Sequence, residues 1–291
     1  MPTRTGNFPI GFRRGGSEWQ RDLNTLAQWA RQNGFDAIDL GPITAADVQT
    51  LQNAGLRLGS VDLHTAGLLD NDPGRRREAQ ERALAQIRDN TALGARAFFL
   101  VVMPDAALPR NEAYHRAVEA YAPLAEALAA AGASLAIEGW PGGSPHLPAL
   151  CCTPETCRRF LVDLGGRGVG LNYDPSHLIR LGVDHIRFLN EFAPYVRHVH
   201  AKDTELFPEA VYEYGLYQPA VFAQPHGWGE HVWRYTLPGH GCARWTEILR
   251  ILQQSGFDGI VSVELEDENF NGSEAGEKAG LIHARDFLHG I

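Results

Sequence analysis

Short runs of β-branched and aliphatic residues alternate along the whole chain with longer amphipathic stretches. This alternation is typical of parallel β-α units, in which a buried strand is followed by a helix that covers the sheet. The apolar runs predict strands at residues 6–12, 36–40, 57–63, 96–103, 134–138, 169–173, 196–201 and 259–265. The amphipathic stretches predict helices at residues 17–33, 44–53, 73–93, 112–131, 154–164, 184–192, 245–255 and 276–288.

Glycines mark the ends of several predicted helices, because a residue that tolerates positive φ is common just after a helix C-terminus. They are Gly34, Gly55, Gly94, Gly132 and Gly256. Eight strands and eight helices in 291 residues predict a closed (β/α)8 TIM barrel as one domain spanning residues 1–291, since such barrels have about 250 residues plus insertions. An open doubly wound sheet is the alternative, and the missing glycine-rich fingerprint after every strand disfavours it.

The segment from residue 204 to 241, after the seventh predicted strand, breaks the alternation. It has no helical period but many aromatic residues: Phe207, Tyr212, Tyr214, Tyr217, Phe222, Trp228, Trp233 and Tyr235. A loop of this length in a compact domain is usually functional or disordered, and aromatic content opposes disorder. We expect a lid or wall over the functional site, with a contact between subunits as the alternative.

Composition narrows the class of protein. The chain is 44% hydrophobic and 21% charged, enough to bury a full core, and its net charge of -9 repels a phosphate backbone. We therefore expect no nucleic-acid partner. The 4 cysteines are too few and too bunched for a disulfide framework, and neither a secretory signal nor a membrane-spanning run is visible. These features predict a cytoplasmic protein with no membrane partner.

Residues that can bind a metal ion occur where four successive strands are predicted to end. In barrel enzymes the active site lies at these strand ends. Glu138, Asp174, His200 and Glu264 occupy these ends. Each alone is an ordinary strand-end or turn residue, but unpaired carboxylates gathered at a barrel mouth repel one another unless a cation neutralises them. Three carboxylates and one imidazole predict a site for Mn²⁺, Mg²⁺ or Co²⁺ rather than structural zinc.

The motifs around these residues resemble those of the xylose isomerase-like barrel superfamily of sugar isomerases and epimerases, which includes the sugar phosphate isomerase/epimerase family and the endonuclease-four type DNA repair enzymes. The segments that carry the resemblance are the Glu138 strand end, DPSH at 174–177, HVHAKD at 198–203, LPGHG at 237–241 and GFDGIVSVELE at 256–266. The resemblance implies that Glu138, Asp174, His200 and Glu264 hold one divalent metal, commonly Mn²⁺, with Mg²⁺, Co²⁺ and Zn²⁺ as alternatives. It also implies that His177 contacts a carbohydrate substrate and that the protein forms a homo-oligomer.

The predicted activity is a metal-dependent epimerase or isomerase acting on a keto-sugar or sugar phosphate. A metal on a carbonyl oxygen and a neighbouring hydroxyl makes the adjoining carbon acidic and stabilises an enediolate. Glu138 and Glu264 are the candidate catalytic pair, one removing the proton and the other returning it, with the order left open. The aromatic insertion suggests a substrate larger than a free monosaccharide, such as a glycoside or keto-glycoside.

Four further residues are candidates for substrate binding, each with a plainer alternative. Lys202 contacts the substrate or pairs with Asp203, and His64 contacts the substrate, binds a second metal or is a capped core histidine. Trp140 stacks on a sugar or plugs the rim, and Arg234 reaches a substrate anion or is a solvated loop arginine.

Other function classes remain as alternatives. A dehydratase or lyase on a keto-sugar or keto-glycoside shares the first proton abstraction. A DNA repair endonuclease would need further histidines, yet Met103 and Pro104 end the fourth predicted strand and no Asp-x-His pair lies between His200 and Glu264. A non-catalytic sugar-binding barrel would leave the four strand-end residues unexplained.

Overall fold

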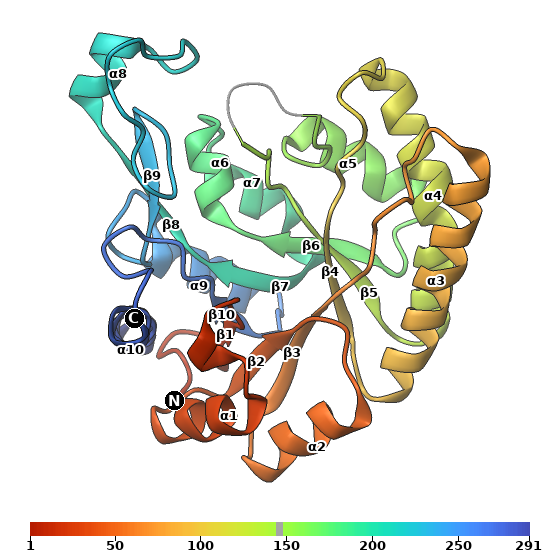
Figure 1. The fold of residues 1–291 in the computed structure, drawn as a ribbon, viewed down its shortest axis with the longest axis horizontal. Coiled ribbons are helices and arrows are strands. Elements are labelled where there is room, and N and C mark those ends of the chain that lie inside the picture. Colours follow the sequence, from red (N-terminus) through yellow and green to blue (C-terminus); the bar gives the residue numbers. More distant parts are fainter. Residues whose placement is uncertain (144–147) are drawn as a thin grey trace.

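A computed structural model describes residues 1–143 and 148–291 and shows a closed barrel of parallel strands surrounded by helices (Figure 1). The order around the barrel is β1-β10-β7-β6-β5-β4-β3-β2. The barrel strands are β1 (Ile10–Arg13), β2 (Ala37–Leu40), β3 (Arg57–Asp62), β4 (Ala97–Val101), β5 (Ser134–Glu138), β6 (Val169–Tyr173), β7 (Val196–Ala201) and β10 (Val261–Val263). The predicted (β/α)8 barrel is confirmed.

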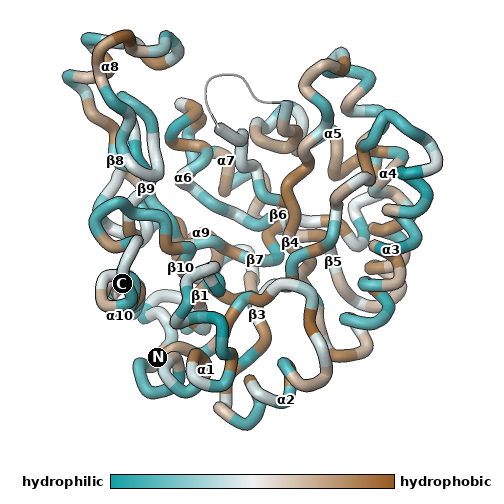
Figure 2. Tube along the Cα trace, in the orientation of Figure 1, coloured by the Kyte–Doolittle hydropathy of each residue, from teal (hydrophilic) through white to brown (hydrophobic). Residues whose placement is uncertain are grey.

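The outer layer is helical. Its α-helices are α1 (Leu23–Gln32), α2 (Ala45–Asn53), α3 (Pro73–Ala92), α4 (Arg110–Ala130), α5 (Pro154–Asp163), α6 (Pro175–Arg180), α7 (His185–Phe192), α9 (Trp245–Gln254) and α10 (Glu274–Gly290), with short 3-10 turns η1 (Glu18–Gln20) and η2 (Ala193–Tyr195). Figure 2 shows the contrast between the hydrophobic strand β4 and the largely hydrophilic helix α3 outside it. No helix in the described ranges is long and apolar enough to cross a lipid bilayer.

Two predicted boundaries differ from the structure for local reasons. The strand predicted at 6–12 begins only at Ile10, because Gly6 and Asn7 have φ values of 79° and 53°, outside the extended region. The helix predicted at 17–33 is interrupted, because the Asp22 carboxylate accepts hydrogen bonds from the backbone N–H groups of Asn24 and Thr25 and so starts α1 anew.

The segment from 204 to 241 is more ordered than expected. It begins within the antiparallel pair β8 (Asp203–Leu206) and β9 (Trp233–Thr236), and the short helix α8 (Pro208–Tyr214) lies between these strands. The strands are too short for a readable period, and their partners lie about thirty residues apart along the chain. Figure 1 shows that β8 and β9 stand beside α6 while α8 projects away from the barrel.

Candidate metal centre

The four predicted metal ligands meet at the mouth of the barrel. One ligand atom from each of Glu138, Asp174, His200 and Glu264 lies within 4.8 Å of the others. Glu138 ends β5, Asp174 follows β6, His200 lies in β7 and Glu264 follows β10. Because these four strands are consecutive around the barrel, their carboxyl ends converge on one point.

His200 faces the carboxylates with one ring nitrogen. Its Nδ1 atom lies 2.7 Å from Glu138 Oε2 and 3.5 Å from Glu264 Oε2. Burial disfavours a charge on His200, but the carboxylates of Glu264 and Glu138 outweigh it and raise its pKa well above the ordinary value. In the absence of a metal ion, a positively charged His200 neutralises part of the negative charge.

Buried polar atoms without hydrogen-bond partners show that a cation fits this cluster. Within the described part of the chain, Asp174 Oδ2 and His177 Nε2 are buried and accept or donate no hydrogen bond. Burial raises the pKa of Asp174, although its Oδ1 atom accepts a hydrogen bond from Ser176 N at 2.8 Å. The effect of burial outweighs His177 and Lys202, which favour the charged form. Because buried polar groups are rarely left without partners, an ion coordinated by Asp174 would satisfy the orphaned oxygen.

Lys202 is the cation already present at this cluster. Its Nζ atom donates to Glu264 Oε2 at 2.5 Å and to Glu266 Oε2 at 2.8 Å, and it lies 3.5 Å from Asp174 Oδ2. The alternative that Lys202 pairs with Asp203 is wrong. The carboxylate of Asp203 instead accepts hydrogen bonds from the N–H groups of Thr204, Gly239 and Ala243 and from the Trp245 indole.

The opposite nitrogen of His200 faces a buried carboxylate that sequence reasoning missed. Asp39 Oδ2 lies 3.6 Å from His200 Nε2 and 2.9 Å from His198 Nε2. Asp39 Oδ1 accepts hydrogen bonds from Ser60 N at 2.9 Å and Ser262 Oγ at 3.0 Å. His198 Nε2 is hydrogen-bonded to Asp39, whereas His200 Nε2 has no hydrogen-bond partner among the described residues. The carboxylate therefore acts on His200 through its charge, which favours a proton on Nε2 and leaves Nδ1 to face the cluster. Its only signal in the sequence is an aspartate inside a buried strand.

Arg13 is a second missed residue, placed where β1 ends. Its guanidinium donates to both oxygens of Asp62 at 2.7 and 3.1 Å, lies 4.4 Å above the Phe99 ring and has Nε 3.4 Å from Glu264 Oε1. Lys202 and His200, with a smaller contribution from Arg13, overcome the effect of burial and lower the pKa of Glu264 well below its ordinary value.

His177 is held in place by a hydrogen-bond chain from Arg180 through Tyr235. Arg180 donates to the Tyr235 hydroxyl at 2.7 Å, and that hydroxyl lies 2.7 Å from His177 Nδ1. The Tyr235 hydroxyl accepts from Arg180 and keeps its own proton, which it donates to Nδ1 when a neutral His177 carries its proton on Nε2. Nε2 lies 3.3 Å from Glu138 Oε1. His177 therefore presents an N–H donor to the cluster, with a tyrosine from β9 behind it.

Three other predicted substrate-binding residues lie outside this cluster. Among the described residues, the structure gives His64, Trp140 and Arg234 no contact with the four ligands. His64 is exposed and Trp140 is partly exposed. Arg234 is engaged elsewhere, since it donates to Glu205 at 2.8 Å and to Glu268 at 2.7 Å. A substrate contact by any of them stays a prediction.

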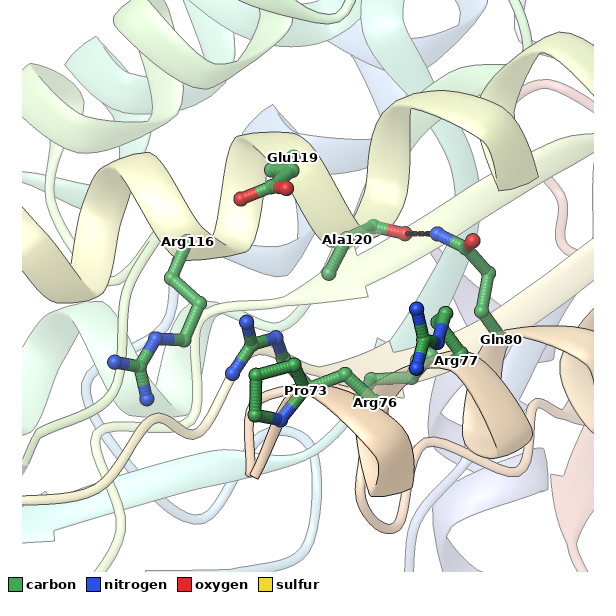
Figure 3. Close-up of a pocket in the computed structure, with 8 residues that line it drawn as sticks. Pro73, Arg76, Arg77, Gln80, Arg116, Glu119 and Ala120 are labelled. Carbon is green, nitrogen blue, oxygen red and sulfur yellow. Dashed lines mark hydrogen bonds between the residues drawn. The ribbon is translucent and has the colours of Figure 1, made fainter. Parts of the chain in front are cut away.

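Two cavities are relevant to the location of a ligand. One of about 430 Å³ adjoins the metal centre and is lined by Glu264, Glu266, Arg13 and residues of neighbouring loops. The other, of about 240 Å³, lies between α3 and α4 and is bordered by Arg76, Arg77 and Arg116 (Figure 3). Arg76 and Arg116 donate to the loop at 70–71, so they hold that loop in place. This outer cavity shares no residue with the metal centre.

Comparison with known proteins gives the family. The sequence pattern of the xylose isomerase-like TIM barrel matches residues 27–289. The chain therefore belongs to this family.

Curated relatives match only part of the chain. The uncharacterized protein YfiH of Bacillus subtilis (strain 168) is 34% identical over 120 residues, which are 40% of this chain and 37% of that protein. The inosose dehydratase of Geobacillus thermodenitrificans (strain NG80-2) is 29% identical over 125 residues, or 42% of this chain and 39% of that protein. The matches thus span about two-fifths of either relative's length.

Solved structures match the whole barrel at low identity. D-psicose 3-epimerase from Clostridium cellulolyticum H10, crystallised with D-tagatose, superimposes with a TM-score of 0.69 at 16% identity over 96% of this chain and 98% of that one. The 3-keto-D-glucoside 4-epimerase YcjR from E. coli gives 0.69 at 13% identity over 97% and 98%. At such identities the likeness establishes a shared fold.

Proposed function

We propose that this protein is a divalent-metal-dependent epimerase or isomerase that removes the proton beside the carbonyl of a keto-sugar. The observation that carries the proposal is the converging set of Glu138, Asp174, His200 and Glu264. A divalent cation held there, with Mn²⁺ the leading choice, supplies Lewis acidity toward a carbonyl and an adjacent hydroxyl. The proteins that share the fold suggest the substrate class. They include an epimerase of D-psicose and an epimerase of a 3-keto-D-glucoside.

Two carboxylates flank the centre in the arrangement that proton transfer needs. Glu138 and Glu264 come from β5 and β10, the outer two of four consecutive strands, so they approach from opposite sides. One removes a proton from one face of the carbon and the other returns a proton to the opposite face. His177 donates from Nε2 to a substrate oxygen that gains negative charge during the transfer.

The local charges favour an uncharged sugar over a sugar phosphate. The cavity beside the metal centre is lined by Glu264, Glu266 and Glu277 against Arg13 and Arg14. Arg13 is already paired with Asp62. A phosphate there would meet more negative than positive charge, whereas sugar hydroxyls form hydrogen bonds with carboxylates at no such cost.

A dehydratase or lyase acting on a keto-sugar or keto-glycoside is the second candidate. Inosose dehydratases recur among the curated relatives. The cluster also offers Lys202 and Glu266, which are hydrogen-bonded to each other beside Glu264 and could protonate a leaving hydroxyl. Both candidates begin with the same proton abstraction, and only the product separates them.

Solvent deuterium exchange tests the shared step. The Mn²⁺-loaded protein is incubated in D₂O with ketohexoses and 3-keto-glycosides, and deuterium beside the carbonyl is followed by NMR. We expect exchange that falls by about 10²-fold or more in Glu138→Gln and Glu264→Gln, and remains in Glu274→Gln, which alters an exposed carboxylate at the start of α10. An epimerised product supports the first candidate and an eliminated product the second. No exchange with any substrate, despite bound Mn²⁺, would overturn the proposal.

A further inference from the structure

We propose that the 430 Å³ cavity beside Glu264 binds a second ring, the aglycone or second sugar of a glycoside whose keto-sugar ring reacts at the metal centre. This inference rests on the proposed function and names its substrate class. We call this cavity the Trp228 pocket; its lining includes Arg13, Gly16, Trp228, Glu264, Glu266 and Asn271.

The Trp228 pocket adjoins the metal centre at Glu264. It shares Glu264 with the ligand set but includes none of Glu138, Asp174 and His200, so it lies to one side of the reacting position. A volume of about 430 Å³ falls in the range of small-molecule sites, about 300 to 1,000 Å³. A ligand that places one ring at the metal centre therefore has room for a second ring beside it.

Trp228 provides the apolar surface that a sugar ring recognises. Its side chain is 47% exposed although it is large and apolar, and its φ of 58° is rare for a residue other than glycine. The surrounding segment enforces this conformation, since the Trp228 carbonyl accepts from Tyr235 N at 2.9 Å and Gly227 N donates to Glu268 at 2.7 Å. Strained residues held by their surroundings often mark binding sites.

The polar wall of the pocket offers hydrogen bonds to hydroxyls. Glu266 receives Lys202 on Oε2 only, and the described residues supply no donor to its Oε1 atom. A site that combines one aromatic face with a few polar groups is suited to a sugar, whose C–H face packs on the indole while its hydroxyls bind the carboxylate. The acidic lining disfavours a negatively charged second group.

Two buried carboxylates make the walls rigid. Glu277 accepts hydrogen bonds from Ser17 Oγ at 2.6 Å, Trp19 Nε1 at 2.7 Å and Gln20 Nε2 at 3.2 Å, which fixes the loop after β1. Asp267 accepts from Thr236 Oγ1 at 2.7 Å and so ties the loop after β10 to β9. A pocket whose walls are already ordered loses little entropy on binding.

The aromatic insertion divides into two parts on this account. Near its base, Trp228 lines the pocket, and Tyr235 contacts His177 at the metal centre. Phe222, near its tip, is 95% exposed and lines none of the cavities described above. Phe222→Ala is therefore a matched control for Trp228→Ala, because it removes an exposed aromatic ring from the same insertion without changing the pocket.

The first test compares a 3-keto-glycoside with a free ketohexose as substrates of the Mn²⁺-loaded enzyme. We expect Trp228→Ala to raise KM for the glycoside about 2- to 13-fold relative to its effect on the ketohexose, because aromatic stacking contributes ~0.5–1.5 kcal/mol. Trp228→Phe should restore most of the glycoside affinity, and Phe222→Ala should change neither KM. Equal effects of Trp228→Ala on both substrates, or none on either, would overturn the inference.

A second test does not depend on catalysis. Glucose and the disaccharides maltose, cellobiose and trehalose are titrated into the protein by calorimetry. If a disaccharide binds more tightly than glucose and Trp228→Ala removes the difference, the result supports ligand binding in the Trp228 pocket. This holds even if no deuterium exchange occurs and the proposed function is wrong. If every disaccharide binds no better than glucose and Trp228→Ala changes nothing, the pocket is refuted while the metal chemistry stands.

Discussion

Asp39 gives the sharpest test of how the barrel prepares its metal ligand. In Asp39→Asn, an amide replaces the carboxylate that faces Nε2 of His200 at 3.6 Å and Nε2 of His198 at 2.9 Å. With the carbonyl oxygen retained opposite Ser60 N and Ser262 Oγ, the amide N–H points at the histidines. Replacing the negative charge beside His200 Nε2 with an amide N–H disfavours a proton on Nε2. It therefore favours the His200 tautomer with its proton on Nδ1, the atom that faces the carboxylates.

The expected loss follows from that change of tautomer. Replacing a residue that orients a metal-binding histidine lowers metal affinity by about 10- to 100-fold, or ~1.4–2.7 kcal/mol. The assay is a Mn²⁺ titration of the purified protein by calorimetry, with thermal melting to confirm that the variant folds.

Asp203→Asn is the matched control for this substitution. Asp203 is a buried carboxylate that accepts several hydrogen bonds but contacts no metal ligand. We expect Asp203→Asn to lower the melting temperature while Mn²⁺ affinity stays within about twofold. Equal affinity losses in both variants would mean that Asp39 acts only on stability, and unchanged affinity in Asp39→Asn would refute the orienting role.

Three further outcomes follow from the same cluster. Lys202→Met should destabilise the metal-free protein by about 3–5 kcal/mol, since it leaves Glu264 and Glu266 without the buried Lys202 ammonium. Added Mn²⁺ should then raise the melting temperature of this variant more than that of wild type. Gly59→Ala should weaken Mn²⁺ binding, because a Cβ atom there would meet Asp39 Oδ1 at 1.8 Å; normal affinity would refute this. A raised His200 pKa stabilises the metal-free fold below pH 6.5, and this stabilisation is lost as pH rises through the folded pKa. Below that pKa, Mn²⁺ affinity should fall about tenfold per pH unit because proton and metal compete, so a flat pH profile would contradict the shift.

The sequence predicts the barrel well where local pattern decides structure. Strands β5, β6 and β7 begin and end where the apolar runs do, because each is buried on both faces and bounded by polar residues. The four ligands were found for the same reason, since the carboxyl ends of such strands must converge.

What the sequence does not reveal depends on contacts between distant residues. Asp39 and His198 are 159 positions apart, and nothing local marks their hydrogen bond. The Tyr235 hydroxyl reaches His177 only because β8 and β9 pair beside α6, and strands of four residues carry no readable period. For Lys202 the sequence left open a substrate contact or a pair with Asp203, its neighbour in sequence. The pairing with Glu264 and Glu266 is not visible there because these acids lie more than sixty positions away.

The central claim is that Glu138, Asp174, His200 and Glu264 together hold one divalent cation. A Mn²⁺ titration followed by electron paramagnetic resonance tests it most directly, because the spectrum separates free from bound Mn²⁺. The account predicts one tightly bound ion per chain, with affinity reduced by about 10²-fold or more in His200→Ala and in Glu138→Gln. The claim would be contradicted if the protein bound no Mn²⁺, or if wild type and both variants bound one ion equally well.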